Sequence, residues 1–175
     1  VNGSAQDLYK FTVSASSQGP VALKQFTLTV AWSDGGTADT LEIESMKLFE
    51  DGVDVTSNVL MSREEGTTVE STSGLLEADE DLNVSWTAGL ESVIAAGSTK
   101  TYTVRGVPQG FRLTGADTVG DSVSFSLVAD TAANGTSMFL NGTALSAGDD
   151  LVWGLHTAAA ATDNGTLYQF IWSDN

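Results

Sequence analysis

Apolar and polar residues alternate with a period of two along several segments of the chain. Successive side chains of a β-strand point to opposite faces, so this alternation predicts strands with one buried face. The apolar sets that share a face are Tyr9, Phe11, Val13 and Ala15; Phe26, Leu28, Val30 and Trp32; Leu82, Val84 and Trp86; Tyr102 and Val104; and Val123, Phe125, Leu127 and Ala129. The outer faces are expected to carry the residues between them, including Gln25, Thr27, Thr29, Thr101, Thr103 and Arg105.

Turn signals separate these segments. The strongest is Glu50-Asp51-Gly52-Val53, because Asp-Gly readily adopts the positive φ angles of a two-residue type I′ hairpin. Ala95 to Ser98 favours a bend that leads into the next strand, although residues 91–96 also fit one helical turn. Residues 62–81 are polar and acidic and predict a loop or an irregular edge.

The last third of the chain carries shorter apolar runs at residues 138–140, 151–153 and 167–172, with Asn-Gly turn dipeptides between them. No segment keeps a helical period beyond a turn or two. The pattern therefore predicts one all-β domain over residues 1–175. We expect an immunoglobulin-like or jelly-roll-type β-sandwich of about nine to eleven mostly antiparallel strands.

Composition narrows the function classes. The chain has no cysteine, and its 23 acidic and 7 basic residues give a net charge of −16. Nucleic acid is a poor partner, because phosphate binding needs clustered Lys and Arg. No apolar run approaches the length of a membrane span, so no membrane insertion is expected. A first residue other than Met fits either an excised fragment or a processed protein, and we expect an extracellular or cell-surface location.

The residue inventory disfavours catalysis. His156 is the single histidine, and its expected loop position fits packing or surface exposure better than a Ser-His-Asp triad. The sequence carries neither a Gly-x-Ser-x-Gly nucleophile motif nor a phosphate-binding glycine loop. Carboxylates are plentiful enough for a glycosidase-like acid pair, so a hydrolase stays the third-ranked hypothesis. We expect a protein that is not an enzyme.

One acidic stretch is a candidate cation site. Glu77, Asp79, Glu80 and Asp81 place four carboxylates within five residues. Calcium takes six to eight oxygen ligands, commonly from loops, which makes Ca²⁺ the candidate cofactor. The alternative, a solvated acidic loop, is favoured because the sequence lacks an Asp-x-Asp-x-Asp-Gly pattern.

Five Asn-x-Ser/Thr sequons are candidate glycosylation sites. They are Asn2, Asn83, Asn134, Asn141 and Asn164. Four of them are Asn-Gly followed by Ser or Thr, a triplet that also arises where a hairpin turn precedes a strand. Turn chemistry is therefore the favoured cause.

The four tryptophans also divide between two roles. Trp32 and Trp86 fall in phase with inward residues and are expected in the core. Trp153 and Trp172 lie in short strands later in the chain. An exposed pair there would offer a stacking platform for a sugar, as in a carbohydrate-binding module.

Several segments of the sequence resemble those of a known group of proteins. They are Leu8 to Val13, Val21 to Leu28, Met46 to Gly52, Ala96 to Tyr102 and Phe170 to Asn175. They resemble uncharacterised secreted bacterial surface β-sandwich domains of the immunoglobulin-like kind. A looser likeness is to fibre-forming sandwich proteins of the TasA and camelysin type, which pass a terminal strand to a neighbour. The resemblance implies a fold and a secreted surface role, and no functional residue is carried over.

We therefore expect a structural subunit of an extracellular filament, pilus or surface layer whose partner is another copy of itself. An edge strand presents unpaired backbone groups that a neighbour's extended segment can complete. The candidate segments are residues 1–13 and 167–175, with assembly residues Leu8, Tyr9, Phe11, Val13, Tyr168, Phe170 and Trp172. The alternative for each segment is pairing within its own chain. The alternative function is an adhesin or carbohydrate-binding module of a larger surface protein, with glycans as partners.

Overall fold

The computed structural model describes residues 3–35, 41–63, 80–87, 89–111, 120–128 and 151–155. These residues form ten strands and one short 3₁₀ turn, η1 (Thr56–Asn58), with no α-helix among them. The strands are β1 (Gln6–Ser14), β2 (Val21–Ser33), β3 (Glu42–Glu50), β4 (Val53–Asp54), β5 (Val59–Arg63), β6 (Glu80–Trp86), β7 (Ser92–Ile94), β8 (Thr99–Gln109), β9 (Ser122–Leu127) and β10 (Leu151–Leu155). No helix in this part of the chain is long and apolar enough to span a membrane.

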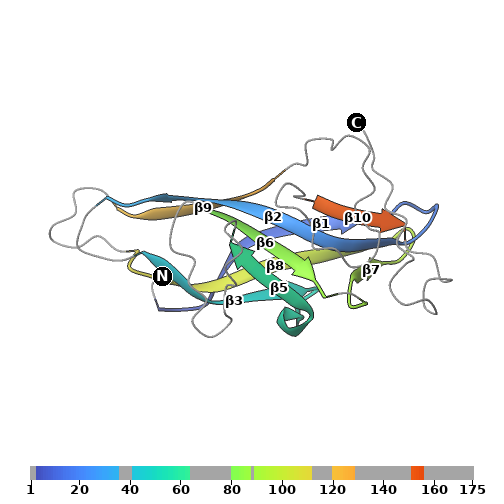
Figure 1. Ribbon diagram of the computed structural model, residues 1–175, viewed down its shortest axis with the longest axis horizontal. Coiled ribbons are helices and arrows are strands. Elements are labelled where there is room, and N and C mark those ends of the chain that lie inside the picture. The colour runs from blue at the N-terminus through green and yellow to red at the C-terminus, as the bar shows by residue number, and fades with distance from the viewer. Residues whose placement is uncertain are drawn as a thin grey trace.

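Two antiparallel sheets pack against each other, which confirms the predicted β-sandwich (Figure 1). The first sheet has the order β1-β8-β3-β4, and the second has the order β10-β2-β6-β5 with β7 and β9 also paired to β2. The two sheets also meet at one edge, where the backbone N–H of Leu127 in β9 donates to the hydroxyl of Tyr9 in β1 at 3.3 Å. Immunoglobulin-like or jelly-roll connectivity stays a prediction.

β2 is the long central strand of the second sheet and is paired along both flanks. One flank is covered by β6 and then β7, and the other by β9 and then β10. Leu127 of β9 pairs with Leu28, whereas Leu151 of β10 pairs with Phe26. Figure 1 shows β9 and β10 beside opposite halves of β2. The end of β9 and the start of β10 therefore lie two positions apart along β2.

Aromatic residues from both sheets meet in the core. The ring of Phe11 lies 4.9 Å from that of Phe26 and 5.1 Å from that of Tyr102. Trp86, which is 2% exposed, contacts both Phe26 and Tyr102. Because these residues come from four strands in two sheets, this cluster holds the layers together, and Trp86 is the core residue that the alternation predicts.

The predicted hairpin and bend are both confirmed. Asp51 has a φ of 49° and Gly52 a φ of 83°, the two positive angles that a type I′ turn requires. Glu50 and Val53 pair across this turn. The Ala95 to Ser98 bend is closed by the Ser98 N–H, which donates to the Ala95 carbonyl at 2.9 Å.

Other local predictions need correction. Residues 62–63 and 80–81 belong to β5 and β6, so the predicted loop is shorter at both ends. Residues 92–94 form strand β7, not a helical turn. Gln25 and Thr27 were expected on an outer face, yet they are only 6% and 1% exposed. Both lie on β2, and the Thr27 hydroxyl donates to Asn83 on β6 at 2.6 Å.

The first sheet loses its register on both flanks of β8 at or next to one glycine. Opposite Gly106, β3 shifts its pairing between Glu44 and Lys47, and opposite the preceding residues of β8, β1 shifts between Asp7 and Tyr9. A Cβ atom at Gly106 would lie 2.5 Å from the Ile43 Cγ2 atom, closer than real Cβ atoms come. Both neighbouring strands therefore bulge where the backbone of β8 is approached most closely.

A comparable irregularity occurs in the second sheet at Lys24, which has no partner in the strand ladders that the structure describes. β10 pairs with Gln25 and Leu23 but skips Lys24, and β6 and β7 are interrupted at the same level. The Lys24 ammonium donates to the Trp86 carbonyl and forms an ion pair with Glu91 at 3.4 Å. The bulged residue thus supplies a hydrogen-bond donor where the ladder between β2 and β6 ends.

Candidate functional site

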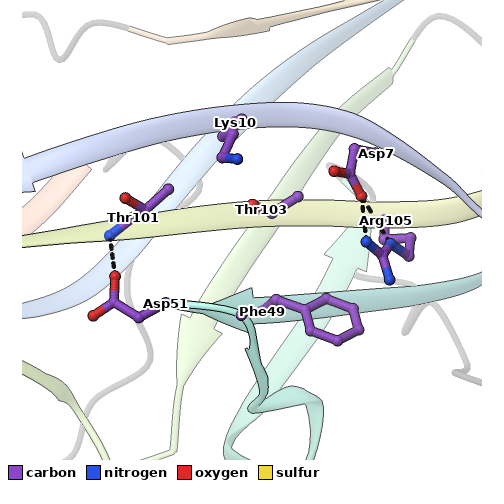
Figure 2. Close-up of a pocket in the computed structure, with 8 residues that line it drawn as sticks. Asp7, Lys10, Phe49, Asp51, Thr101, Thr103 and Arg105 are labelled. Carbon is purple, nitrogen blue, oxygen red and sulfur yellow. Dashed lines mark hydrogen bonds and ion pairs between the residues drawn. The ribbon is translucent and has the colours of Figure 1, made fainter.

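A shallow hollow lies on the outer face of the first sheet, across β1, β8 and β3 (Figure 2). Its volume is about 410 Å³. The residues that line it are Asp7, Lys10, Phe49, Asp51, Gly52, Thr101, Thr103 and Arg105. It is the candidate site because it gathers charged, hydroxyl and aromatic side chains from three strands.

Strand alternation and register bring these side chains together. Tyr102 and Val104 face the core, so Thr101, Thr103 and Arg105 face outward from β8. Thr103 pairs with Lys10 on β1 and with Phe49 on β3, which places one row of side chains across the sheet. Cross-strand partners of this kind lie close enough to interact directly.

One end of the hollow is closed by an ion pair. The Asp7 Oδ1 atom accepts a hydrogen bond from Arg105 Nε at 2.8 Å and forms an ion pair with Arg105 Nη2 at 2.7 Å. The same guanidinium lies 4.6 Å from the centre of the Phe49 ring, within the range of a cation–π contact. Arg105 is therefore engaged by a carboxylate and an aromatic ring at once.

The hairpin forms the other end. The Thr101 N–H donates to the Asp51 carboxylate at 2.8 Å, and the Asp51 N–H donates to the Thr101 carbonyl at 2.8 Å. These two bonds tie the tip of the turn to β8. Figure 2 shows Lys10 and Thr103 between this pair and the Asp7–Arg105 pair.

Between the two ends, the side chains of Lys10 and Thr103 have no ion-pair or hydrogen-bond partner among the described residues. Among the five Lys and Arg side chains that the structure describes, Lys24, Lys47, Lys100 and Arg105 form ion pairs and Lys10 does not. Thr103 is 8% exposed, and its hydroxyl forms no hydrogen bond with the rest of the described chain. The hollow therefore offers one exposed ammonium beside a buried, unused hydroxyl.

A second polar cluster is buried between the sheets. The Ser92 hydroxyl lies 2.6 Å from the Tyr102 hydroxyl and donates to the Glu50 carboxylate at 2.5 Å. Lys100 forms an ion pair with Glu50 and lies 3.4 Å from the Ser92 hydroxyl. Burial raises the pKa of Tyr102 well above its usual range. Because Ser92 is 3% exposed and hydrogen-bonded, the cluster fits structural support better than nucleophilic chemistry.

The acidic candidates are only partly within the described residues. Glu80 and Asp81 are the first two residues of β6, and Glu77 and Asp79 lie outside the described part of the chain. In the part that is described, no three His, Asp or Glu side chains come together as a metal site. Calcium binding at residues 77–81 stays a prediction.

The glycosylation candidates are mostly outside the described residues as well. Asn83 lies within β6, is half-buried, and its Oδ1 atom accepts the hydrogen bond from Thr27. A paired strand position of this kind suits a structural role better than a glycan, which occupies exposed loops. Those outside are Asn2, Asn134, Asn141 and Asn164, and so is His156.

Two tryptophans can be placed. Trp86 is in the core, as described above. Trp32 is partly buried and stacks on Phe111, with ring centres 5.1 Å apart. Trp153 belongs to strand β10, and Trp172 is outside the described residues, so the sugar platform stays a prediction.

The amino-terminal assembly candidates form one face of β1. Leu8, Tyr9, Phe11 and Val13 are partly buried and pack against the core of their own chain. β1 pairs with β8 from Gln6 to Ser14. The carboxy-terminal candidates Tyr168, Phe170 and Trp172 lie outside the described residues.

No local pattern in the sequence predicts the hollow. The alternation does predict that Thr101, Thr103 and Arg105 face outward. Their meeting with Lys10 and Phe49 depends on the register between distant strands, which leaves no local signal. Comparison with protein families, curated protein sequences and solved structures finds no match to this chain.

Proposed function

We propose that this protein is a non-enzymatic structural subunit of an extracellular filament or surface layer, which assembles by exchange of a β-strand between copies. The position of β1 carries the proposal. β1 is the first strand in sequence order and lies at the edge of its sheet, paired with β8 within the described residues. Exchange of β1 would therefore break one ladder and no other.

The apolar face of β1 gives the exchange a driving force. Leu8, Phe11 and Val13 pack against the core, and Phe11 contacts rings from both sheets. A β1 segment from a neighbouring copy would make the same contacts at the same site. The contacts of β1 are the same in the monomer and in the polymer. The protein concentration and the segment that links β1 to β2 therefore determine which of the two forms is favoured.

Another edge supports an alternative route through the carboxy-terminal segment. β5 pairs with β6 in the described part of the chain and has its other flank open there. Leu60 on this strand is 50% exposed, and such an edge can accept an extended strand. Residues 167–175 would be the donor in this arrangement.

A pair of engineered cysteines tests strand exchange directly. Thr12 and Thr101 are cross-strand partners of β1 and β8, and the native chain has no cysteine that would interfere. The variant Thr12→Cys/Thr101→Cys is assembled under reducing conditions, oxidised and run on a denaturing gel without reductant. Exchange of β1 predicts a ladder of covalent oligomers, whereas β1 held in its own chain gives oxidised monomers.

Two further observations complete the test. The single variant Thr12→Cys should give no ladder beyond dimers, because it lacks the second cysteine. Electron microscopy of the wild-type protein should show filaments or ordered layers. Monodisperse monomers across salt and calcium concentrations would rule out the structural role.

The hollow favours a second candidate function, an adhesin or carbohydrate-binding module. Its threonines and charged groups suit a polar ligand. Glycan-array binding that is lost on Thr101→Ala or Thr103→Ala would support this function. Loss on Trp153→Ala or Trp172→Ala instead would assign binding to the predicted tryptophan platform.

A further inference from the structure

We infer that the hollow on the first sheet is an interface that receives a carboxylate side chain from a second copy of this chain. The inference rests on the proposed self-assembly and names a contact of that assembly. Its basis is the pairing of Lys10 with Thr103 across β1 and β8. Together these residues offer an ammonium and a hydroxyl on the same face of the sheet.

The chemistry of the two groups selects the ligand. A carboxylate has two oxygens that accept hydrogen bonds, and Lys and Thr both supply donors. Charge-assisted bonds of this kind are the stronger class of hydrogen bond. Thr103 as a whole is 8% exposed, and a buried polar group without a partner costs free energy that a ligand would recover.

The arrangement at the ends of the hollow limits where a carboxylate can sit. Arg105 is neutralised by Asp7, and the Asp51 carboxylate lies at the hairpin end. Repulsion from Asp51 disfavours an anion there, so the position beside Lys10 and Thr103 is the favoured one. The hollow therefore offers one specific position for a carboxylate and is not a general basic patch.

Charge complementarity selects a second copy as the source. The chain carries 23 acidic residues against 7 basic ones, so most carboxylates of any copy have no basic partner of their own. Lys10 is the converse, a lysine that forms no ion pair with a carboxylate in the described part of its own chain. Repulsion between two acidic copies falls off over about 8 Å at physiological salt, which leaves a close contact at Lys10 favourable.

Zero-length cross-linking tests the contact itself. A carbodiimide joins a lysine amine to a carboxylate only when the two touch. Equal amounts of ¹⁵N-labelled and unlabelled protein are assembled together, cross-linked, digested and analysed by mass spectrometry. We expect Lys10 linked, with mixed isotopic composition, to an Asp or Glu outside the hollow. A mixed link to Asp51 would not count, because exchange of β1 alone would bring Lys10 beside Asp51 of a neighbouring copy.

Lys47 is the matched control on the same face. Its Nζ atom lies 2.9 Å from the Asp54 carboxylate of its own chain, so its cross-links should join peptides of one isotope only. Lys10→Glu should raise the critical concentration for assembly by tenfold or more, whereas Lys10→Arg should stay near wild type. Thr103→Val should weaken assembly less than Lys10→Glu while leaving the melting temperature within a few degrees.

The outcomes separate this inference from the proposed function. Filaments whose Lys10 forms no mixed cross-link, and whose assembly tolerates Lys10→Glu, would overturn the interface and leave the structural role intact. Monomers under every condition would overturn both. Lys10-dependent binding of an acidic polysaccharide, with filaments indifferent to Lys10, would assign the hollow to a glycan and also overturn the interface.

Discussion

The Lys24 ammonium lies 3.4 Å from the Glu91 carboxylate, and both side chains are largely buried, at 12% and 3% exposure. Glu91 also accepts a hydrogen bond from the Gly89 N–H at 3.1 Å. Lys24 is the bulged residue of β2, and Glu91 lies in the break between β6 and β7. The pair therefore stabilises the sheet at the point where its ladder is interrupted.

Loss of either partner should be costly. Lys24→Met removes the ammonium that donates to the Glu91 carboxylate and the Trp86 carbonyl, and we expect a loss of about 3 kcal/mol in the free energy of unfolding. The double variant Lys24→Met/Glu91→Gln should lose less than Lys24→Met alone, because it also removes the buried carboxylate charge that the ammonium balanced. Urea denaturation followed by tryptophan fluorescence measures both. Equal losses of unfolding free energy in the single and double variants would contradict the pairing of Lys24 with Glu91.

Gly106 should tolerate no side chain. The Cβ atom of Gly106→Ala would meet Ile43 and Met46 on β3 and Leu8 on β1, so we expect a destabilisation of about 1–3 kcal/mol from overpacking. Gly19→Ala is the control, since a Cβ atom there meets nothing within 4 Å. Thermal unfolding compares the two, and equal melting temperatures would contradict the close approach described for β8.

Asp54 should titrate at unusually low pH. The Thr56 hydroxyl and the Lys47 ammonium donate to its carboxylate and lower the pKa to about 2 from 3.8. A depressed carboxylate pKa stabilises the folded state above pH 3.8, and this contribution disappears as the pH falls toward 2. Thr56→Val should raise the pKa more than Lys47→Gln, because the Thr56 bond is the larger cause. Carboxyl-carbon NMR titration measures both shifts.

Tyr102 should make the fold sensitive to alkali. Burial raises the pKa of its hydroxyl above the usual 10, so the folded state holds this group neutral while the unfolded chain ionises it. The resulting stability is present below pH 10 and is lost as the pH rises further. Tyr102→Phe should unfold with a weaker pH dependence above 10. A parallel decline in both proteins would exclude Tyr102 as the cause.

The parts of the fold that the sequence predicts are those with a local signal. Phe26, Leu28 and Val30 share a face because alternation requires it, and Asp51-Gly52 turns the chain because its angles suit that turn. Lys24 breaks the alternation of β2 without any local mark, since its bulge depends on strands far away in the sequence. The environment of Thr27 likewise includes Asn83 of β6, a residue far away in the sequence.

The candidate site also depends on contacts between distant strands, which the local sequence does not predict. Outward orientation of Thr103 follows from its neighbours in β8, but its partners Lys10 and Phe49 come from strands 93 and 54 residues away in sequence. Many registers would satisfy the same hydrophobic pattern. The register shifts in β1 and β3 lie at or next to Gly106, where a Cβ atom would meet residues of both neighbouring strands.

The broken flank of β2 also makes the protein a convenient display scaffold. The ladder of β9 ends at Leu28 and that of β10 begins at Phe26, so the end of one strand and the start of the next lie close together along β2. The entropy of closing a loop between two such points grows slowly with the length of the loop. An epitope or a small folded tag grafted between these strands would leave both pairings intact and would repeat once per subunit along any polymer.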